Sequence, residues 1–315
     1  MQKILVTDTI FVLPQHELLL EAAGFKVERL RGPTVTEAEL LEAVKDKVGY
    51  IVGGVEQVTS KVIETAHALR AIVHCGSAYK TFIPAWREAT AKGIAIATVP
   101  DGHVHAVAEW AQAAALAMNR GFFNQAASGT VPGLESQTLG IIGLGHIGKR
   151  LAEMLQANRP RTILYNSAHR HTDYETKLRL TYSTLTHLLH ESDVVFLCVS
   201  GEVKPGFFGK KQLASMKPNA LLVSFMIPGV IDADALFDAL RTGKVRATSD
   251  YPMDGRFASL PLSQWYGSTE SNAFNTVAGV DETSSAAVQS LIALLTQGDD
   301  TYVVNHTFKR ALLAK

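Results

Sequence analysis

The sequence of 315 residues has very little cysteine and no excess of charge of either sign. Cys75 and Cys198 are its only cysteines, and two cysteines so far apart form neither a disulfide scaffold nor a zinc site. We therefore predict a reducing, cytoplasmic environment. The 30 basic and 30 acidic residues balance without forming a basic stripe. This balance argues against nucleic acid or an anionic membrane as a partner.

Long apolar runs are also missing. No run is long enough to span a bilayer, so no membrane helix is expected. The first residues read as a strand followed by a turn, and no signal peptide is predicted there. Low-complexity segments and internal repeats do not occur.

The residues that are present indicate a globular α/β protein, with 47% hydrophobic and 19% charged residues. The length favours two domains. Strands and helices alternate through residues 1–100 and again from Thr138, which predicts parallel sheets. Among these elements we expect a helix over 36–44 with a capping box from Thr36 to Glu39, and a helix over 83–91. The last strand is expected at 273–277.

The clearest motif is a glycine-rich turn between a strand at 138–142 and a helix at 149–155. Gly143 permits the tight turn, Gly145 lets the backbone approach a pyrophosphate, and Gly148 lets helix and strand pack closely. His146 and Ile147 lie where the helix N-terminus would hold the phosphates. The context on both sides predicts a dinucleotide site rather than a plain structural turn.

About twenty residues after the motif, such sites have an acidic residue that binds the 2′-hydroxyl of NAD. Asn166 stands at that place here, and Ser167, His169 and Arg170 follow it. All three can donate to a phosphate. The pattern therefore favours NADP, with NAD as the alternative, and a polar loop without any phosphate contact is the plainer interpretation.

Five segments together resemble the D-isomer-specific 2-hydroxyacid dehydrogenase family. They are 92–100, 106–110, 138–148, 216–223 and 247–250. The resemblance implies two doubly wound parallel-sheet domains with a cleft between them. Residues 1–100 and 284–315 would form a flavodoxin-like substrate domain, and residues 101–283 would form a Rossmann-type dinucleotide-binding domain.

The resemblance also assigns positions on the cofactor side. Asp250 would lie beside the nicotinamide carboxamide, and the alternative is a solvated acid at the end of a strand. Cys198 and Val199 fall in the loop that the family places near the pyrophosphate. For Cys198 a packed thiol is expected rather than a reactive one.

The family's catalytic arginine, glutamate and histidine are not found where the resemblance places them. Ile227 stands at the position of the arginine, Gly255 at that of the glutamate and Thr276 at that of the histidine. No histidine occurs anywhere between His190 and His306. Isoleucine offers neither a charge nor a donor, so the family's usual reaction is expected to be slow or absent.

Four other side chains are candidates to replace this set: Lys80, His103, Tyr251 and Asp254. Lys80 ranks first because a long cationic side chain can take over from the missing arginine, and a surface lysine is the alternative. His103 can also be a structural histidine at the connection between the domains. No metal site is expected, because His103 and His105 are two residues apart and no carboxylate cluster joins them.

These observations predict an NAD(P)-dependent oxidoreductase with an altered catalytic site, which reduces a small carbonyl or imine compound. The alternative is a non-catalytic dinucleotide-binding sensor or partner subunit. A homodimer is expected because the long apolar helix at 104–118 needs a partner surface. The arm with which members of the family usually wrap the partner subunit is shortened here, and residues 128–133 stand in its place.

Overall fold

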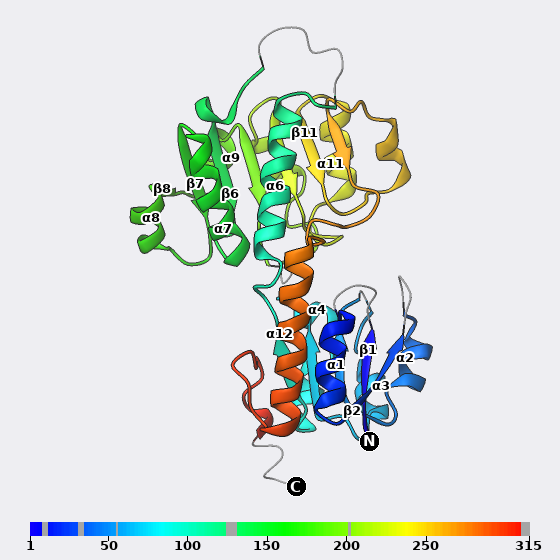
Figure 1. Ribbon diagram of the computed structural model, residues 1–315. Coiled ribbons are helices and arrows are strands. Elements are labelled where there is room, and N and C mark those ends of the chain that lie inside the picture. The colour runs from blue at the N-terminus through cyan, green and yellow to red at the C-terminus, as the bar shows by residue number, and fades with distance from the viewer. Residues whose placement is uncertain (8–11, 31–34, 55, 124–130, 201–202, 310–315) are drawn as a thin grey trace. The chain divides into compact units, whose positions relative to one another are not determined.

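The protein is described by a computed structural model that covers residues 1–7, 12–30, 35–54, 56–123, 131–200 and 203–309 (Figure 1). The chain forms two compact units. The first unit is Met1–His103 with Thr276–Lys315, and the second unit is Val104–Asn275. The sequence predicts a boundary between residues 283 and 284. In the structure this boundary falls ahead of α12 (Val277–Thr296), because that helix runs unbroken and packs on the first unit's sheet.

The described part of the first unit contains a five-stranded parallel sheet in the order β2-β1-β3-β4-β5. Its strands are β1 (Gln2–Thr7), β2 (Phe25–Leu30), β3 (Lys47–Val52), β4 (Ala71–His74) and β5 (Ala95–Thr98). This order confirms the predicted flavodoxin-like fold. Helices α2 (Glu37–Ala43), α3 (Ser60–Thr65) and α5 (Trp86–Ala91) pack on one face, while α1 (Pro14–Ala22) and α12 lie against each other and α12 contacts the strands.

Local sequence signals explain two details of this unit. The predicted capping box is present, since Thr36 accepts from the N–H of Glu39 and the Glu39 carboxylate accepts from the N–H of Thr36. The helix predicted over 83–91 is shorter in the structure, where it begins at Trp86 as α5. A separate short helix, α4 (Tyr79–Phe82), precedes it, because Pro84 lacks an N–H and disfavours helical geometry in the residue before it.

Within its described residues, the second unit contains a seven-stranded parallel sheet in the order β12-β11-β10-β9-β6-β7-β8. Its strands are β6 (Thr138–Ile142), β7 (Thr162–Asn166), β8 (Leu180–Tyr182), β9 (Val194–Leu197), β10 (Ala220–Ser224), β11 (Val245–Ser249) and β12 (Trp265–Gly267). The chain order reverses between β6 and β9. This is the Rossmann arrangement, in which ligands bind at the carboxyl ends of the strands at that reversal.

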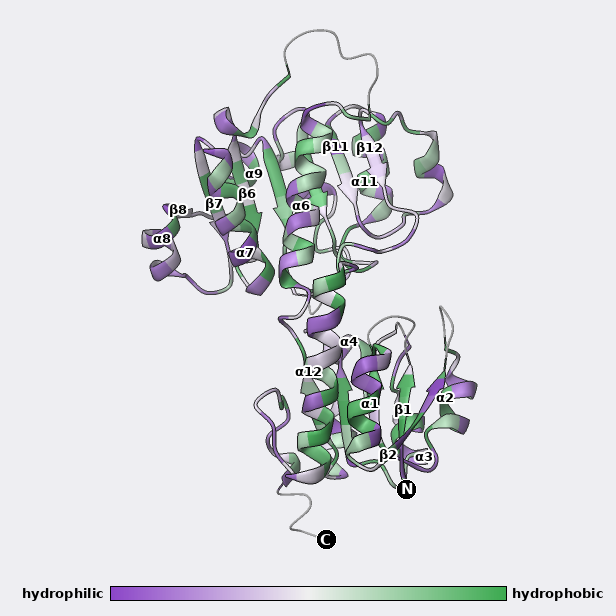
Figure 2. Cartoon of the chain, viewed as in Figure 1, coloured by the Kyte–Doolittle hydropathy of each residue, from purple (hydrophilic) through white to green (hydrophobic). Residues whose placement is uncertain are grey.

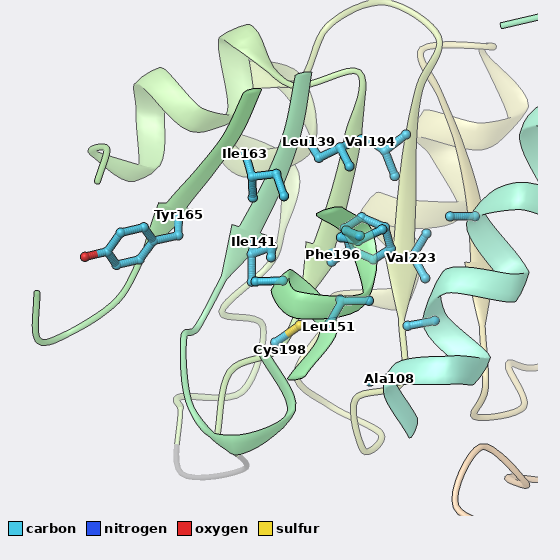
Figure 3. Packing of buried hydrophobic residues seen from close by; sticks show 14 of the residues in the cluster. Ala108, Leu139, Ile141, Leu151, Ile163, Tyr165, Val194, Phe196, Cys198 and Val223 are labelled. Atoms are coloured by element: carbon cyan, nitrogen blue, oxygen red, sulfur yellow. The ribbon is translucent and has the colours of Figure 1, made fainter. Parts of the chain in front are cut away.

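Helices cover both faces of this sheet. They are α6 (Val104–Asn119), α7 (His146–Leu155), α8 (Thr172–Leu178), α9 (Leu185–Glu191), α10 (Lys210–Ser215) and α11 (Ala233–Arg241). The strands are apolar on both faces, as in buried parallel sheets. In Figure 2, β6 is largely hydrophobic and the helix α8 is largely hydrophilic. Figure 3 shows Ile141, Ile163 and Phe196 on the face that Leu151 of α7 covers.

One expectation about this unit is wrong, and another concerns residues that lie partly outside the described part of the chain. The strand expected at 273–277 does not form, because the backbone N–H groups of Asn272 and Ala273 donate to the Asp250 carboxylate instead of to a neighbouring strand. The last strand is β12, paired with β11 from Ala247↔Trp265 onward. Of the shortened arm, residues 128–130 lie outside the described residues.

The long apolar helix α6 finds its partner surface inside its own unit. Ala108, Ala111 and Ala115 are fully buried in the cluster that α7 and the central strands share. The apolar face of this helix therefore does not by itself require a second chain. No helix among the described residues is both long and apolar enough to cross a membrane.

Candidate dinucleotide and catalytic site

Two of the three glycines in the turn between β6 and α7 are required by the packing of the protein itself. Gly143 has a φ of +98°, and a Cβ there would collide with the carbonyl group of Cys198. A Cβ on Gly148 would collide with the carbonyl oxygen of Gly143. Both positions therefore need glycine for the packing of the protein itself.

Gly145 differs from these two. It is exposed, its φ is −82°, and an added Cβ would meet no described heavy atom within 4 Å. Nothing in the described structure therefore requires glycine at this position. A ligand that approaches the backbone would require it, and this is the role that the sequence predicts for Gly145.

The N-terminus of α7 has the electrostatics of an anion site. Helix geometry leaves the first N–H groups without an acceptor inside the helix, and the helix dipole adds partial positive charge there. His146 is exposed and Ile147 is half-buried at this end, and no acidic residue occurs in the first turn. The arrangement suits a phosphate group next to Gly145.

The neighbouring strand ends lie around this turn. The N–H of Gly143 donates to the carbonyl of Asn166 at 2.7 Å, and the N–H of Cys198 donates to Ile142 at 2.7 Å. Val199 is half-buried beside Cys198. The structure thus brings Gly143, Asn166, Cys198 and Val199 to one edge of the sheet.

Cys198 is a packed residue. Its side chain lies in the core cluster beside Leu151 (Figure 3), and burial raises the pKa of the thiol well above its usual range. A thiol held in its protonated form is a poor nucleophile, so the expectation of a packed rather than reactive cysteine is confirmed.

The residues predicted for the ribose side occupy the loop after β7. The Asn166 side-chain amide donates to the carbonyl of Ser183 at 2.8 Å. Ser167 is half-buried, and His169 and Arg170 are exposed. Arg170 makes a two-pronged ion pair with Glu175, with Nε to Oε1 and Nη2 to Oε2 both at 2.8 Å. Glu175 is not among the residues predicted from the sequence, although an acidic residue five positions after Arg170 is a signal that could have found it.

Asp250 lies at the carboxyl end of β11 and is 2% exposed, so the alternative of a solvated acid is wrong. Its Oδ1 accepts the N–H groups of Asn272 and Ala273 at 2.9 Å, and its Oδ2 accepts the Ser271 hydroxyl at 2.6 Å. The carboxylate therefore fixes the segment after β12 against the end of β11.

Ser271 also lies between Asp250 and Tyr251, because its hydroxyl donates to Asp250 and interacts with the Tyr251 hydroxyl. Burial is the main cause that raises the pKa of Tyr251, the interaction with Ser271 lowers it in part, and the Asp250 charge raises it further. Tyr251 thus stays protonated at neutral pH and can donate a hydrogen bond. Ser271 could not be predicted from the sequence as a site residue, because only the turn held by Asp250 brings its side chain next to Asp250.

Asp254 has a structural role at the surface. It is exposed, it caps the short 3₁₀ turn Gly255–Ser259 through the N–H of Arg256, and it pairs with the Arg256 guanidinium at 2.9 Å. Arg256 also pairs with Asp234 at 2.6 Å. These contacts give Asp254 a structural role, and its catalytic role stays a prediction.

The other two catalytic candidates belong to the first unit. Lys80 lies in α4, half-buried, with its Nζ 5.6 Å from the centre of the Tyr79 ring and 5.9 Å from that of Trp86. His103 closes the first segment of the unit, and burial lowers its pKa. A Cβ on Gly76 would lie 3.8 Å from Cε1 of His103.

His74 is a second histidine beside Gly76 that the sequence analysis missed. It ends β4, and its ring stacks on Phe82 with the centroids 5.0 Å apart. A Cβ on Gly76 would lie 3.2 Å from its Nε2, so the rings of His74 and His103 flank the same glycine. Burial, and after it the neighbouring His103, lowers the pKa of His74 to about 4.

The buried His74 predicts a loss of stability in acid. Its folded-state pKa of about 4 lies below the ordinary 6.5, so the unfolded chain takes up the proton first. The stabilisation is complete above about pH 6.5 and is lost as the pH falls towards 4, by up to roughly 3 kcal/mol. Urea unfolding at pH 7.5 and pH 5 measures most of this loss, roughly 2 kcal/mol.

In this experiment His74→Gln should weaken the pH dependence, whereas His67→Gln, at an exposed histidine, should retain it. An unchanged pH dependence in His74→Gln would contradict the assignment.

Comparison with known proteins agrees with this architecture. Residues 102–254 match the family described as D-isomer specific 2-hydroxyacid dehydrogenase, NAD binding domain. The D-3-phosphoglycerate dehydrogenase of Methanocaldococcus jannaschii is 33% identical over 263 residues, which are 79% of this chain. They are only 48% of that protein, so this chain matches about half of its length.

Two further matches extend the comparison. The glyoxylate reductase of Thermococcus litoralis is 28% identical over 76% of this chain and 77% of its own. A crystal structure of a Thermus thermophilus protein covers 96% of this chain and 100% of its own, with a TM-score of 0.85 and 24% identity, which shows a common fold. The chain belongs to the D-isomer-specific 2-hydroxyacid dehydrogenase family.

Proposed function

We propose that this chain is an NAD(P)-dependent oxidoreductase with an altered catalytic site, which reduces a small carbonyl or imine compound. The observation that carries the proposal is Gly145, an exposed glycine at a helix N-terminus that the protein's own packing does not require. The match of residues 102–254 to the family's NAD-binding domain supports the same assignment.

In this proposal the N–H groups at the start of α7 hold the pyrophosphate, and Gly145 leaves room for it. Asp250 orients the nicotinamide end, while Cys198 and Val199 form part of the wall near the phosphates. The dinucleotide would supply the hydride, and the protein would supply orientation and a proton donor.

We further propose that NADP is preferred to NAD. Asn166 brings no carboxylate to the position that excludes a 2′-phosphate, and Ser167, His169 and Arg170 bring donors. The loop is therefore compatible with a phosphate, and the strength of its preference for NADP depends on how far Arg170 is available.

The altered catalytic site is supported by what the three substituted residues do instead. Ile227 packs against the apolar cluster on one face of the second unit's sheet. Thr276 caps α12, because its hydroxyl accepts the N–H of Gly279 at 3.1 Å. Gly255 begins the short 3₁₀ turn that Asp254 caps. The side chains at 227, 255 and 276 carry no charge, and none of them can both bind a carboxylate and donate a proton to a developing alkoxide.

Tyr251 is the candidate proton donor that the contacts favour, ahead of Lys80, His103 and Asp254. It lies in the same unit as the glycine turn, directly after Asp250, and its hydroxyl interacts with Ser271, which donates to Asp250. An imine substrate would ease the demand on this donor, because an imine can arrive already protonated.

A non-catalytic dinucleotide sensor or partner subunit is the second candidate function. The residues at 227, 255 and 276 favour it, since they lack the chemistry of the family's catalytic set. The glycine turn is compatible with both candidates, so turnover has to separate them.

The test is consumption of NADPH and NADH with a panel of small carbonyls and imines, beside calorimetric binding of both dinucleotides. We expect binding of both, turnover with some member of the panel, and very slow turnover of pyruvate, glyoxylate and hydroxypyruvate. Turnover of those three at ordinary enzyme rates, about 1–1000 per second, would contradict an altered site. Binding without any turnover would favour the sensor.

A further inference from the structure

Arg170, the cation nearest in sequence to the proposed ribose site, already has an acidic partner. Its side chain is 61% exposed, and the Nε and Nη2 edge of the guanidinium binds both oxygens of Glu175. Such a fork-to-fork pair is the geometry in which arginine binds a carboxylate or a phosphate most strongly. A phosphate that approaches this edge therefore meets a carboxylate in its place.

Glu175 is held where it is by more than Arg170. It lies in α8 with its side chain only 16% exposed, and the hydroxyl of Tyr165 donates to its Oε1 at 2.7 Å. Tyr165 comes from β7, immediately before Asn166, and its ring extends away from the other labelled side chains in Figure 3. The same hydroxyl accepts the N–H of His171 at 2.8 Å. One carboxylate thus ties α8 to the strand end and to the loop 167–171.

We propose that Glu175 is a specificity-determining residue that limits the affinity of this site for the 2′-phosphate of NADPH. This inference rests on the proposed function. Glu175 neutralises Arg170 and places a negative charge beside the position that a 2′-phosphate would take. The hydroxyl-bearing ribose of NADH carries no charge there and is not opposed.

The charge of Glu175 is permanent in any ordinary assay. The hydrogen bonds from Arg170 and Tyr165 lower the pKa of its carboxyl to about 2. The repulsion therefore persists throughout the neutral range. Negative charge placed against one ligand is a common way to separate two ligands that share all other contacts.

The experiment compares NADPH and NADH affinity in the unaltered chain, Glu175→Gln and Glu153→Gln. Glutamine has the shape of glutamate, and its one oxygen can still accept from Tyr165 and from Nε of Arg170, so the loop keeps most of its anchor although the bond from Nη2 is lost. Glu153 is a matched control, because it is ion-paired with Arg150 and Lys177 in the same unit and its loss changes the net charge equally. Thermal unfolding checks that both variants fold.

We expect Glu175→Gln to raise the affinity for NADPH about tenfold and to leave the affinity for NADH within about twofold, since only the charge beside the 2′-phosphate is removed. Adenosine 2′,5′-bisphosphate, compared with AMP as a second probe, should show the same gain. Glu153→Gln should change neither dinucleotide, and Arg170→Ala should weaken NADPH more than NADH.

An NADPH affinity that is unchanged or lower in folded Glu175→Gln, with NADH still bound, would overturn this inference alone. Equal gains in Glu175→Gln and Glu153→Gln would also overturn it, because they would show a general charge effect. If neither dinucleotide bound the unaltered chain, the proposed function would fail together with it.

Discussion

Gly145→Val is expected to weaken the binding of NADPH and NADH at least about a hundredfold while the protein remains folded. The backbone at Gly145 has φ −82° and ψ −158°, a conformation open to any residue, and an added Cβ meets no described atom within 4 Å. The valine side chain would instead occupy the space beside the first N–H groups of α7, where the pyrophosphate is proposed to lie. Calorimetric titration measures the affinity, and circular dichroism measures the fold.

Gly148→Ala is the contrasting variant for this experiment. A Cβ at Gly148 would collide with the carbonyl oxygen of Gly143, so this change should lower the free energy of unfolding. Gly145→Val should leave it within about 1 kcal/mol, the usual size of an exchange at a helix N-cap. Unchanged dinucleotide affinity in folded Gly145→Val would remove the observation on which the proposed function depends.

The second large effect is expected for Tyr251→Phe, which should lower turnover at least about a hundredfold and leave dinucleotide affinity within about threefold. Phenylalanine retains the ring and removes only the hydroxyl, which interacts with Ser271 beside Asp250. Charge develops on the substrate oxygen or nitrogen as hydride arrives, and a positioned hydroxyl stabilises it. Because the pKa of Tyr251 is raised above 10.0, turnover should not fall with increasing pH below about pH 10.

Tyr266→Phe is the matched control, since Tyr266 lies on β12 of the same unit with its ring stacked on Phe123 at 4.0 Å. It should leave turnover unchanged. Full activity in Tyr251→Phe, together with a hundredfold loss in Lys80→Met, would transfer the donor role to Lys80. Full activity in both variants would favour the sensor.

Local sequence chemistry was sufficient wherever neighbours in the chain decide the structure. The capping box of α2 depends on Thr36 and Glu39, three residues apart. The strand, turn and helix from Thr138 to Leu155 follow from apolar spacing and three glycines. The order of alternating elements then predicts parallel sheets, because consecutive parallel strands require a crossover helix.

The same reasoning failed where distant residues compete for the backbone or for a side chain. The segment at 273–277 has the composition of a strand, but Asp250 binds the N–H groups of Asn272 and Ala273 across more than twenty residues of sequence, and α12 begins at Val277. From the sequence alone Arg170 is a free cation, whereas in the structure Glu175 of α8 is paired with it. From the sequence alone His74 is only part of an apolar strand, whereas in the structure its ring lies next to Gly76 and near His103.

The family, the two doubly wound sheets and the glycine turn could all be predicted from the sequence, because each is encoded in spacing along the chain. Which side chains share a site depends on the tertiary structure. It placed Ser271 between Asp250 and Tyr251, Asp254 on a surface ion pair, and Glu175 on Arg170. Contacts of this kind are set by strand order and by the direction of each side chain across the sheet, and neither is visible in a single sequence.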